Sequence, residues 1–363
     1  MPQKSDCSTF EGLHETHQLR AEHSAGIACI AAVAQTNAPV AGLSVPGLEA
    51  FDEMMLATLA KNDYPGGSLA VSYQGRMVLS KTYGFAKKGL TGNTPMPAEQ
   101  RMRIASMSKW ITAVAALKAA EQGKLNLDQP VAEILAWSQK PADYTDARAL
   151  KITTRQLLQN HAGWTIDRSN DPMFERAPAC PASAERWVSR QKLDADPGQH
   201  YSYSNINFCI AQLALEKATG QSYADFVKST IAQPLGITSW QIASLRGSAD
   251  EPEYASSQGQ DSNPYTNLNF DALGAAGAWV SSSSDYVRFL SGIRGSSGVS
   301  LLKPDSVAQL ITRPSTPDGA TKPTYYGLGT NVRALDAGLV PIVLTRQGTH
   351  CSGGEVLDRK SVV

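Results

Sequence analysis

The sequence predicts an α/β (α+β) fold, in which an antiparallel sheet is flanked by helices and an all-helical lobe is inserted between its strands. Strand patterns occur early, at residues 67–80, and return late, at residues 325–332 and 340–345. Helical patterns dominate between about residues 124 and 280. Because strand patterns stand on both sides of this helical region, we expect the early and late strands to meet in one sheet.

The first predicted element is a helix over residues 48–59, in which apolar residues recur every three to four positions after a Pro-Gly pair. Residues 67–80 then predict a β-hairpin with its turn at Gln74 and Gly75. An apolar stripe over residues 106–122 predicts a central helix that ends at Gly123. Further helices are predicted at residues 153–160, 185–193, 205–218 and 222–231.

Residues 1–45 are predicted to be a leader or linker, and residues 46–357 a single domain that contains the helical lobe. Residues 25–34 resemble the short apolar core of an export signal and end in a small-residue pattern, although mixed-charge residues precede them. This pattern slightly favours a periplasmic or secreted protein over a cytoplasmic one.

Charge and cysteine usage exclude several classes of protein. Lys+Arg and Asp+Glu balance at 33 each, so no global field favours nucleic acid or an anionic membrane. No stretch approaches the roughly 18 continuous apolar residues that span a bilayer. The five cysteines are widely spaced and form no zinc or redox motif, so most are predicted to be free, with Cys209 a small buried hydrophobe.

Ser106 and Lys109 are the candidate nucleophile and general base. Residues three apart on a helix share one face, so the amine can reach the hydroxyl. At the start of a helix, unpaired backbone N–H groups and the positive helix end favour negative charge that develops nearby. The lysine must be neutral to accept the proton, which desolvation or a neighbouring positive charge favours. The pair therefore predicts a tight, buried cleft.

The bare spacing of a serine and a lysine is common, and two other segments have it. Ser189 and Lys192 stand in a charged, exposed stretch. The second segment, residues 300–303, is followed at once by Pro304, which marks the start of a helix. Only Ser106 both follows a strand-like run and opens a long apolar helix.

Tyr203 and Asn205 form the second candidate pair, after a Pro-Gly turn and before another apolar helix. A phenol near the lysine can shuttle a proton to the leaving group, and the Asn amide can hold both Lys109 and a substrate carbonyl. Tyr265 and Asn267 have the same spacing and are the rival pair. Their surroundings predict a loop without a following helix, so the first pair is preferred.

Five blocks of sequence occur in the order seen in class C-like β-lactamases and the esterases related to them. They are RIASMSK (103–109), LLQNHAG (157–163), PG to YSN (197–205), GAAGAWVS (274–281) and YGLG (326–329). Over residues 48–350 the chain therefore resembles the serine β-lactamase and penicillin-binding-protein-like family.

The resemblance implies a β-lactamase/DD-peptidase-like fold and an acyl-enzyme formed on Ser106. It further implies acid/base roles for Lys109 and Tyr203 and a positioning role for Asn205. Backbone N–H groups of Ser106 and of the third-motif strand would form the oxyanion hole.

The third motif departs from the family, whose members carry K-T-G or H-x-G on a strand. The nearest match here is RQG after the last predicted strand, with His350 as a second option. Its glycine would let a substrate approach the backbone closely. Gln347, Gly348 and Thr349 are therefore the predicted substrate-binding or oxyanion residues. An esterase-like relative is favoured over a dedicated β-lactamase.

The chain ends sooner than its relatives, which continue with two more strands and a terminal helix. Those strands lie between the hairpin and the third-motif strand, so the C-terminal strands of the sheet would be missing. Residues 358–363 match an in-frame translation of common sequencing-adapter DNA and are interpreted as a non-native tail. We expect a gene fragment that stops near Leu357, and a protein of this length could be inactive.

Two function classes follow from these residues. The first is a serine hydrolase that acts through an acyl-enzyme on small-molecule carboxylic esters or on β-lactam and peptide-like amides. The second is a non-catalytic penicillin-binding-like or sensor protein that keeps the fold. We expect no nucleic-acid partner, no membrane span, no metal and no cofactor. The histidines near His14 lack metal-site spacing, and GAAG (274–277) predicts a tight turn before a helix rather than a phosphate loop.

Overall fold

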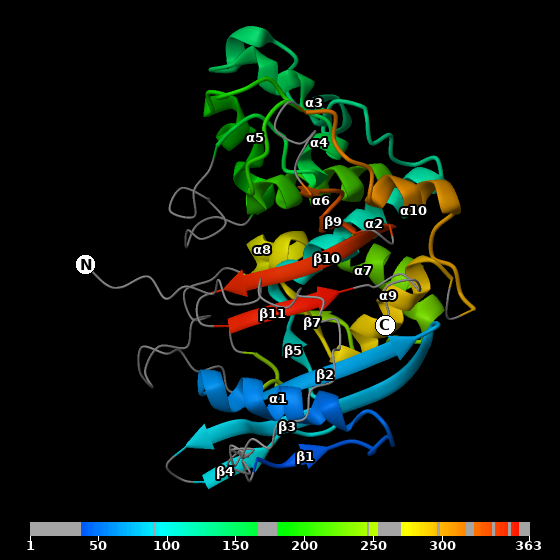
Figure 1. Cartoon of the computed structure of the whole chain (residues 1–363). Coiled ribbons are helices and arrows are strands. Elements are labelled where there is room, and N and C mark those ends of the chain that lie inside the picture. Colours follow the sequence, from blue (N-terminus) through cyan, green and yellow to red (C-terminus); the bar gives the residue numbers. More distant parts are fainter. Residues whose placement is uncertain are drawn as a thin grey trace, which may run out of the picture. The chain divides into compact units, whose positions relative to one another are not determined.

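The computed structural model describes residues 38–89, 92–165, 180–244, 247–252, 270–295, 298–316, 323–335, 338–347 and 350–355. The chain divides into two compact units, Met1–Asn37 and Ala38–Val363, and all elements described below belong to the second unit. Most of the predicted leader and the whole predicted tail lie outside the described residues. Figure 1 labels most of the helices and strands by the names used here.

The early strands form an antiparallel hairpin, as predicted. Strand β2 (Gly66–Tyr73) pairs with β3 (Arg76–Gly89) through a two-residue turn, in which Gln74 and Gly75 have φ values of 51° and 76°. Positive φ at both turn residues matches the twist of the flanking strands and fixes their register. The other strands of this sheet and the helices that contact it are β1 (Val40–Ala41), β4 (Gly92–Pro95), α1 (Glu49–Asn62) and α9 (Ser283–Ile293).

The predicted central helix is α2 (Ser108–Glu121), which lies in the core with every residue from Ser108 to Leu117 buried. Each fully buried aliphatic side chain, such as that of Ile111, contributes about 1.5–3 kcal/mol relative to its exposed state. The helices that contact α2 are α6 (Asn205–Thr219), α7 (Tyr223–Val227), α8 (Phe270–Gly277) and α10 (Pro304–Leu310) (Figure 1).

Short helices fill much of the described chain between residues 124 and 280. Helix α4 (Thr154–Leu158) begins with a capping box, in which Thr153 and Gln156 each accept a hydrogen bond from the backbone N–H of the other. The other segments are α3 (Val131–Ile134), η2 (Pro141–Asp143), η3 (Ala147–Lys151), α5 (Cys180–Arg190), the π-helical turn η5 (Lys228–Ala232) and η6 (Gln233–Leu235).

The late strands form a sheet of their own, so the expectation that they meet the early strands in one sheet is wrong for the described residues. Their order is β11 (His350–Glu355), β10 (Gly338–Gln347), β9 (Asn331–Leu335) and β8 (Thr324–Tyr326). Strand β11 pairs with β10, β2 pairs with β3, and no described strand bridges the two sheets. A third sheet joins β5 (Met102–Arg103), β7 (Trp279–Ser281) and β6 (Gln241–Ile242).

The single strand predicted over residues 325–332 is wrong in its middle, where a turn separates β8 from β9. Gly327 N–H donates to the carbonyl oxygen of Thr330 at 2.8 Å, which closes the turn. A Cβ atom at Gly327 would collide with the carbonyl oxygen of Leu310. The glycine therefore serves a close approach between segments, whereas the apolar pattern alone indicated a strand.

Cys209 is buried, as predicted, but it is disulfide-bonded rather than free. The apolar run around it correctly indicates a position inside α6. Pairing depends on which thiols the tertiary fold brings within bonding geometry, and the wide spacing of the cysteines in sequence carries no sign of that.

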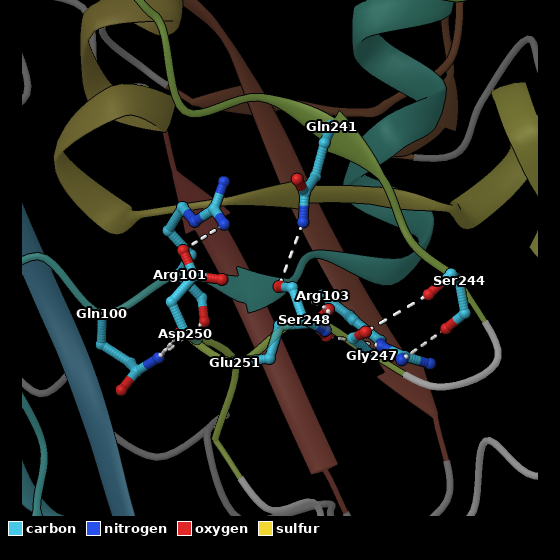
Figure 2. Close-up of polar contacts among 9 residues, drawn as sticks. All are labelled: Gln100, Arg101, Arg103, Gln241, Ser244, Gly247, Ser248, Asp250 and Glu251. Carbon is cyan, nitrogen blue, oxygen red and sulfur yellow. Dashed lines mark hydrogen bonds and ion pairs between the residues drawn. The ribbon is translucent and has the colours of Figure 1, made fainter.

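Strand β5, which leads to the candidate nucleophile, is held by a buried ion pair. Arg103 Nε lies 2.7 Å from Glu251 Oε2, and both side chains are 3% exposed. Arg103 Nη2 also donates to the carbonyl oxygen of Ser244 at 2.9 Å. Figure 2 shows this pair beside a second one, between Arg101 and Asp250. These contacts fix the position of the strand that precedes Ser106.

Replacing Glu251 by Gln should destabilise the protein by about 3–5 kcal/mol, because the buried charge of Arg103 then lacks its counter-charge. Asp196→Asn is the matched control: Asp196 is 67% exposed in its ion pair with Arg148, and such surface pairs contribute at most about 1 kcal/mol. Urea denaturation measures the free energy of unfolding of both variants. Equal losses would contradict the structural importance of the buried pair.

Candidate active site

The candidate nucleophile, Ser106, lies in the 3₁₀ turn η1 (Ala105–Met107), between β5 and α2. The backbone passes through Ala105 at φ 46°, in the left-handed region, which costs an alanine about 1–2 kcal/mol. Backbone strain of this kind clusters at functional sites. Ile104 N–H donates to the carbonyl oxygen of Trp279 at 3.0 Å, which anchors the turn to β7.

Lys109 extends from the first turn of α2 and has 0% exposure. Its Nζ lies 2.6 Å from Asn205 Oδ1, 2.6 Å from the carbonyl oxygen of Ala276 and 3.1 Å from Ser106 Oγ. All of these oxygen atoms belong to uncharged groups.

Tyr203 approaches Ser106 from the open side of the site. Its hydroxyl donates to Ser106 Oγ at 2.6 Å, and Lys109 Nζ lies 4.8 Å from the centre of its ring. Tyr203 is 39% exposed, whereas Lys109 reaches the same oxygen atom from the interior. The structure thus brings Lys109 and Tyr203 to the hydroxyl of Ser106, and Asn205 to the amine of Lys109.

Asn160, for which the sequence motifs predicted no role of its own, holds the loop that carries Tyr203. It is fully buried, with φ 59°. Its Oδ1 accepts hydrogen bonds from Ser204 N at 3.2 Å and from Asn207 Nδ2 at 3.0 Å, and its carbonyl oxygen accepts one from Ser202 N at 2.8 Å. The sequence does place an asparagine at the end of the predicted helix 153–160. Asparagine adopts the left-handed region readily, so this position could have indicated the end of the helix and its positive φ.

The ring of Tyr326 packs against both Tyr203 and Tyr201, and we call these three residues the aromatic wall (Tyr201, Tyr203 and Tyr326). The ring centre of Tyr326 lies 6.3 Å from that of Tyr203 and 5.5 Å from that of Tyr201. Burial raises the pKa of Tyr326 well above its ordinary value and raises the pKa of Tyr201 to about 12. Both phenols are therefore neutral near pH 7, and the wall carries no charge from them.

The YGLG block (326–329) packs against the backbone of Lys109. Gly329 has φ 71°, and its N–H donates to the carbonyl oxygen of Leu158 at 2.9 Å. A Cβ atom at this position would lie only 2.5 Å from the carbonyl oxygen of Lys109. Glycine therefore allows the turn between β8 and β9 to approach α2 at the residue that carries the candidate base.

Ala276, whose carbonyl oxygen meets Lys109, belongs to the GAAG block (274–277). The predicted tight turn before a helix is wrong, because these residues form the end of α8 and lead into β7. Gly274 has non-helical backbone angles, φ 8° and ψ −101°, inside α8. The carbonyl oxygens of Ala275 and Ala276, which follow this irregularity, accept hydrogen bonds from side chains of α2.

The third motif is described only in part. Gln347 is the last residue of β10 and stands opposite His350 of β11. Both strands contact the turn that carries Ser106. Gly348, Thr349 and the side chain of Gln347 lie outside what the structure describes, as does the rival segment 265–267.

Within the described parts of the chain, no cluster of at least three His, Cys, Asp or Glu side chains is placed to hold a metal ion. No helix in these parts combines the length and the apolar character needed to cross a membrane.

Comparison with known sequences places the chain in a family. The sequence model of the family described as "Beta-lactamase" matches residues 51–354. A "Probable fimbrial assembly protein FimD, serogroup H1" from Dichelobacter nodosus is 36% identical over 137 residues, which is 37% of this chain and 34% of that protein. "Protein flp" from Staphylococcus aureus (strain N315) is 26% identical over 187 residues, 52% of this chain and 36% of its own length. The alignments thus span about a third of the length of these curated relatives.

Solved structures of several hydrolases share the fold. A D-stereospecific amidohydrolase from Streptomyces sp. superposes with a TM-score of 0.62 at 25% identity, over 84% of this chain and 93% of that one. EstCE1, a hydrolase with promiscuous acyltransferase activity, gives a TM-score of 0.63 at 20% identity, with coverages of 78% and 82%. The D-alanine carboxypeptidase AmpC from Burkholderia cenocepacia gives 0.67 at 16% identity, with coverages of 85% and 90%.

The family match covers most of the chain, and structures of penicillin-binding-protein and class C type share its arrangement of antiparallel sheets and flanking helices. This protein therefore belongs to the β-lactamase family, as the ordered motifs of its sequence predicted.

Proposed function

We propose that this protein is a serine hydrolase that cleaves carboxylic esters or amides through an acyl-enzyme formed on Ser106. The observation that carries the proposal is the position of one hydroxyl group. Ser106 Oγ lies 3.1 Å from Lys109 Nζ and 2.6 Å from the hydroxyl of Tyr203. A serine is a weak nucleophile unless a base stands within hydrogen-bond reach, and here an amine does.

The contacts of Lys109 Nζ suit a neutral amine that acts as the base. A neutral amine has two N–H bonds and one lone pair. Asn205 Oδ1 and the carbonyl oxygen of Ala276 can only accept, and both lie at 2.6 Å, so they take the two N–H bonds. Ser106 Oγ lies at 3.1 Å, and its hydroxyl can donate its proton to the lone pair.

In the proposed first half-reaction, Ser106 Oγ attacks the substrate carbonyl carbon while its proton moves to Lys109 Nζ. The carbonyl oxygen becomes negative and is stabilised by backbone N–H groups at the start of α2. When the bond to the leaving group breaks, Tyr203 gives that group its proton, and the ammonium of Lys109 beside the ring restores it. The products are the acyl-enzyme and the protonated leaving group.

Water completes the reaction in the second half. As the water oxygen attacks the acyl carbon, Tyr203 takes a proton from the water and passes its own proton to the amine of Lys109, which later returns a proton to Ser106 Oγ. Ser106 Oγ then leaves and regains a proton, which releases the carboxylic acid. Each half-reaction returns the side chains to their starting protonation states, so no additional reactant is required.

The preferred substrates that we propose are small carboxylic esters. The third motif contains RQG in place of K-T-G, and the exposed part of the aromatic wall offers apolar surface, since Tyr201 and Tyr203 are 38% and 39% exposed. The solved amidohydrolase at 25% identity supports amides as the second class of substrate. The same three side chains, Ser106, Lys109 and Tyr203, would cleave both esters and amides.

Replacing Ser106 by Ala should abolish hydrolysis of p-nitrophenyl acetate or butyrate, with kcat/KM falling by at least roughly 10³-fold, because the acyl group then has no oxygen to attach to. Ser189→Ala is the matched control, because Ser189 also precedes a lysine by three positions but its hydroxyl donates to the carbonyl oxygen of Arg186. Release of p-nitrophenol measures both variants.

Intact-protein mass spectrometry with a fluorophosphonate provides a second measurement, in which Ser106 alone should carry the label. A protein that is labelled but never turns over would favour the non-catalytic binding or sensor function. Nitrocefin in the same assay separates a β-lactamase from an esterase. Undiminished activity of Ser106→Ala would refute the assignment.

Replacing Tyr203 by Phe should lower kcat by about 10²–10⁴-fold and leave KM nearly unchanged, because the ring stays and only the proton-shuttling hydroxyl is lost. Tyr201→Phe is the matched control, since this neighbouring residue of the aromatic wall has a similar exposure. Steady-state kinetics with the same esters measure both. Equal effects of the two substitutions would argue against a proton-transfer role of Tyr203.

A further inference from the structure

The carbonyl oxygen that accepts a hydrogen bond from Lys109 belongs to Ala276. The preceding residue, Ala275, is hydrogen-bonded at both its N–H and its carbonyl group. The N–H of Ala275 donates to Gln212 Oε1 at 3.0 Å. Its carbonyl oxygen accepts a hydrogen bond from Thr112 Oγ1 at 2.7 Å. The peptide groups that lead into Ala276 are therefore fixed by one side chain of α6 and one of α2.

The hydroxyl of Thr112 belongs to a chain of donors that runs in one direction. Trp279 Nε1 donates to the hydroxyl oxygen of Tyr223 at 2.8 Å. The Tyr223 hydroxyl lies 2.7 Å from Thr112 Oγ1, so it can donate its own proton there. Thr112 then directs its proton to Ala275, at 2.7 Å, rather than to the carbonyl oxygen of Ser108, at 3.2 Å. Chained hydrogen bonds polarise and strengthen one another.

The three side chains of this hydrogen-bond chain are buried in the core. Thr112, Tyr223 and Trp279 are 1%, 2% and 0% exposed. Burial raises the pKa of Tyr223 above its ordinary value, so its phenol keeps its proton and remains a donor. In such surroundings a hydroxyl without its acceptor is costly, which holds Thr112 in the rotamer that faces Ala275.

We propose that Thr112 is a positioning residue for the proposed base: with Tyr223 and Trp279 behind it, it fixes Ala275 so that the carbonyl oxygen of Ala276 aims Lys109 Nζ at Ser106. The inference rests on the proposed function. The hydroxyl of Thr112 contacts Ser108, Tyr223 and Ala275, and it acts on Lys109 through the backbone. Lys109 lies one helical turn before Thr112 on α2, so both ends of this connection are on the same rigid element.

The effect on catalysis follows from the geometry of the amine. Its two N–H bonds are directed by Asn205 and Ala276, and the direction of the lone pair depends on both acceptors. A misplacement of about 1 Å in a reacting group can cost about 10²-fold in rate. Loss of the hydroxyl of Thr112 releases the carbonyl group of Ala275, which is the side joined to Ala276, so the amine is no longer held toward Ser106.

A pair of substitutions at one position tests the proposal. Thr112→Val keeps the shape of the side chain and removes the hydroxyl, whereas Thr112→Ser keeps the hydroxyl and removes a methyl group. We expect Val to lower kcat for p-nitrophenyl butyrate by at least about tenfold with KM nearly unchanged. Ser should retain activity within about threefold of the unmodified protein, which is rescue by the conservative variant. Thermal unfolding verifies that both variants are folded.

The opposite order of activities, with Val near the unmodified protein and Ser impaired, would show that Thr112 acts by packing and would overturn the proposal. Equal losses for both variants would overturn it as well. If Val does not fold, Tyr223→Phe provides the second variant, because it removes the donor that orients Thr112. It should lower kcat with KM nearly unchanged, and full activity of this variant would refute the donor chain.

The same experiment separates this inference from the proposed function. An unmodified protein that hydrolyses no ester and takes no serine-directed label contradicts the proposed function, and the inference falls with it. An unmodified protein that is active and sensitive to Ser106→Ala, beside a fully active Thr112→Val, contradicts only the inference.

Discussion

Lys109 Nζ is withdrawn from water and held between the oxygen atoms of Asn205 and Ala276, within reach of Ser106. A buried amine is tolerated only where such partners are in place, because an unsatisfied polar group in the core costs several kcal/mol, of the order of 2–7. The partners come from α6, from the end of α8 and from the turn before α2. These elements must be assembled before the amine is satisfied, so the same contacts specify the fold and the candidate chemistry.

The backbone near this amine departs from regular structure at two non-glycine residues. Ala105 and Asn160 both adopt positive φ, the first beside the candidate nucleophile and the second beneath the loop of Tyr203. Left-handed backbone at a non-glycine residue is unfavourable, and it persists where surrounding hydrogen bonds determine it. Asn160 supplies such bonds itself through its amide and its carbonyl group.

Much of this arrangement could be predicted from the sequence, because local patterns carry it. The hairpin turn at Gln74 and Gly75 and the apolar stripe of α2 are local signals, and the ordered motifs indicated the family. The disulfide of Cys209 and the role of Ala276 could not be predicted, because each depends on tertiary neighbours. Every residue has a main-chain carbonyl group, so the sequence does not indicate which one will accept a hydrogen bond from Lys109.

The turn between β8 and β9 touches α2 through Gly329, with no room for even a methyl group beside the carbonyl oxygen of Lys109. The late sheet and the helix that carries the amine therefore cannot slide past one another independently. A side chain inserted there would act as a wedge, and its displacement would reach the amine without any contact with substrate. Through Gly329, the position of strands β8 and β9 therefore affects the direction of the lone pair on Lys109 Nζ.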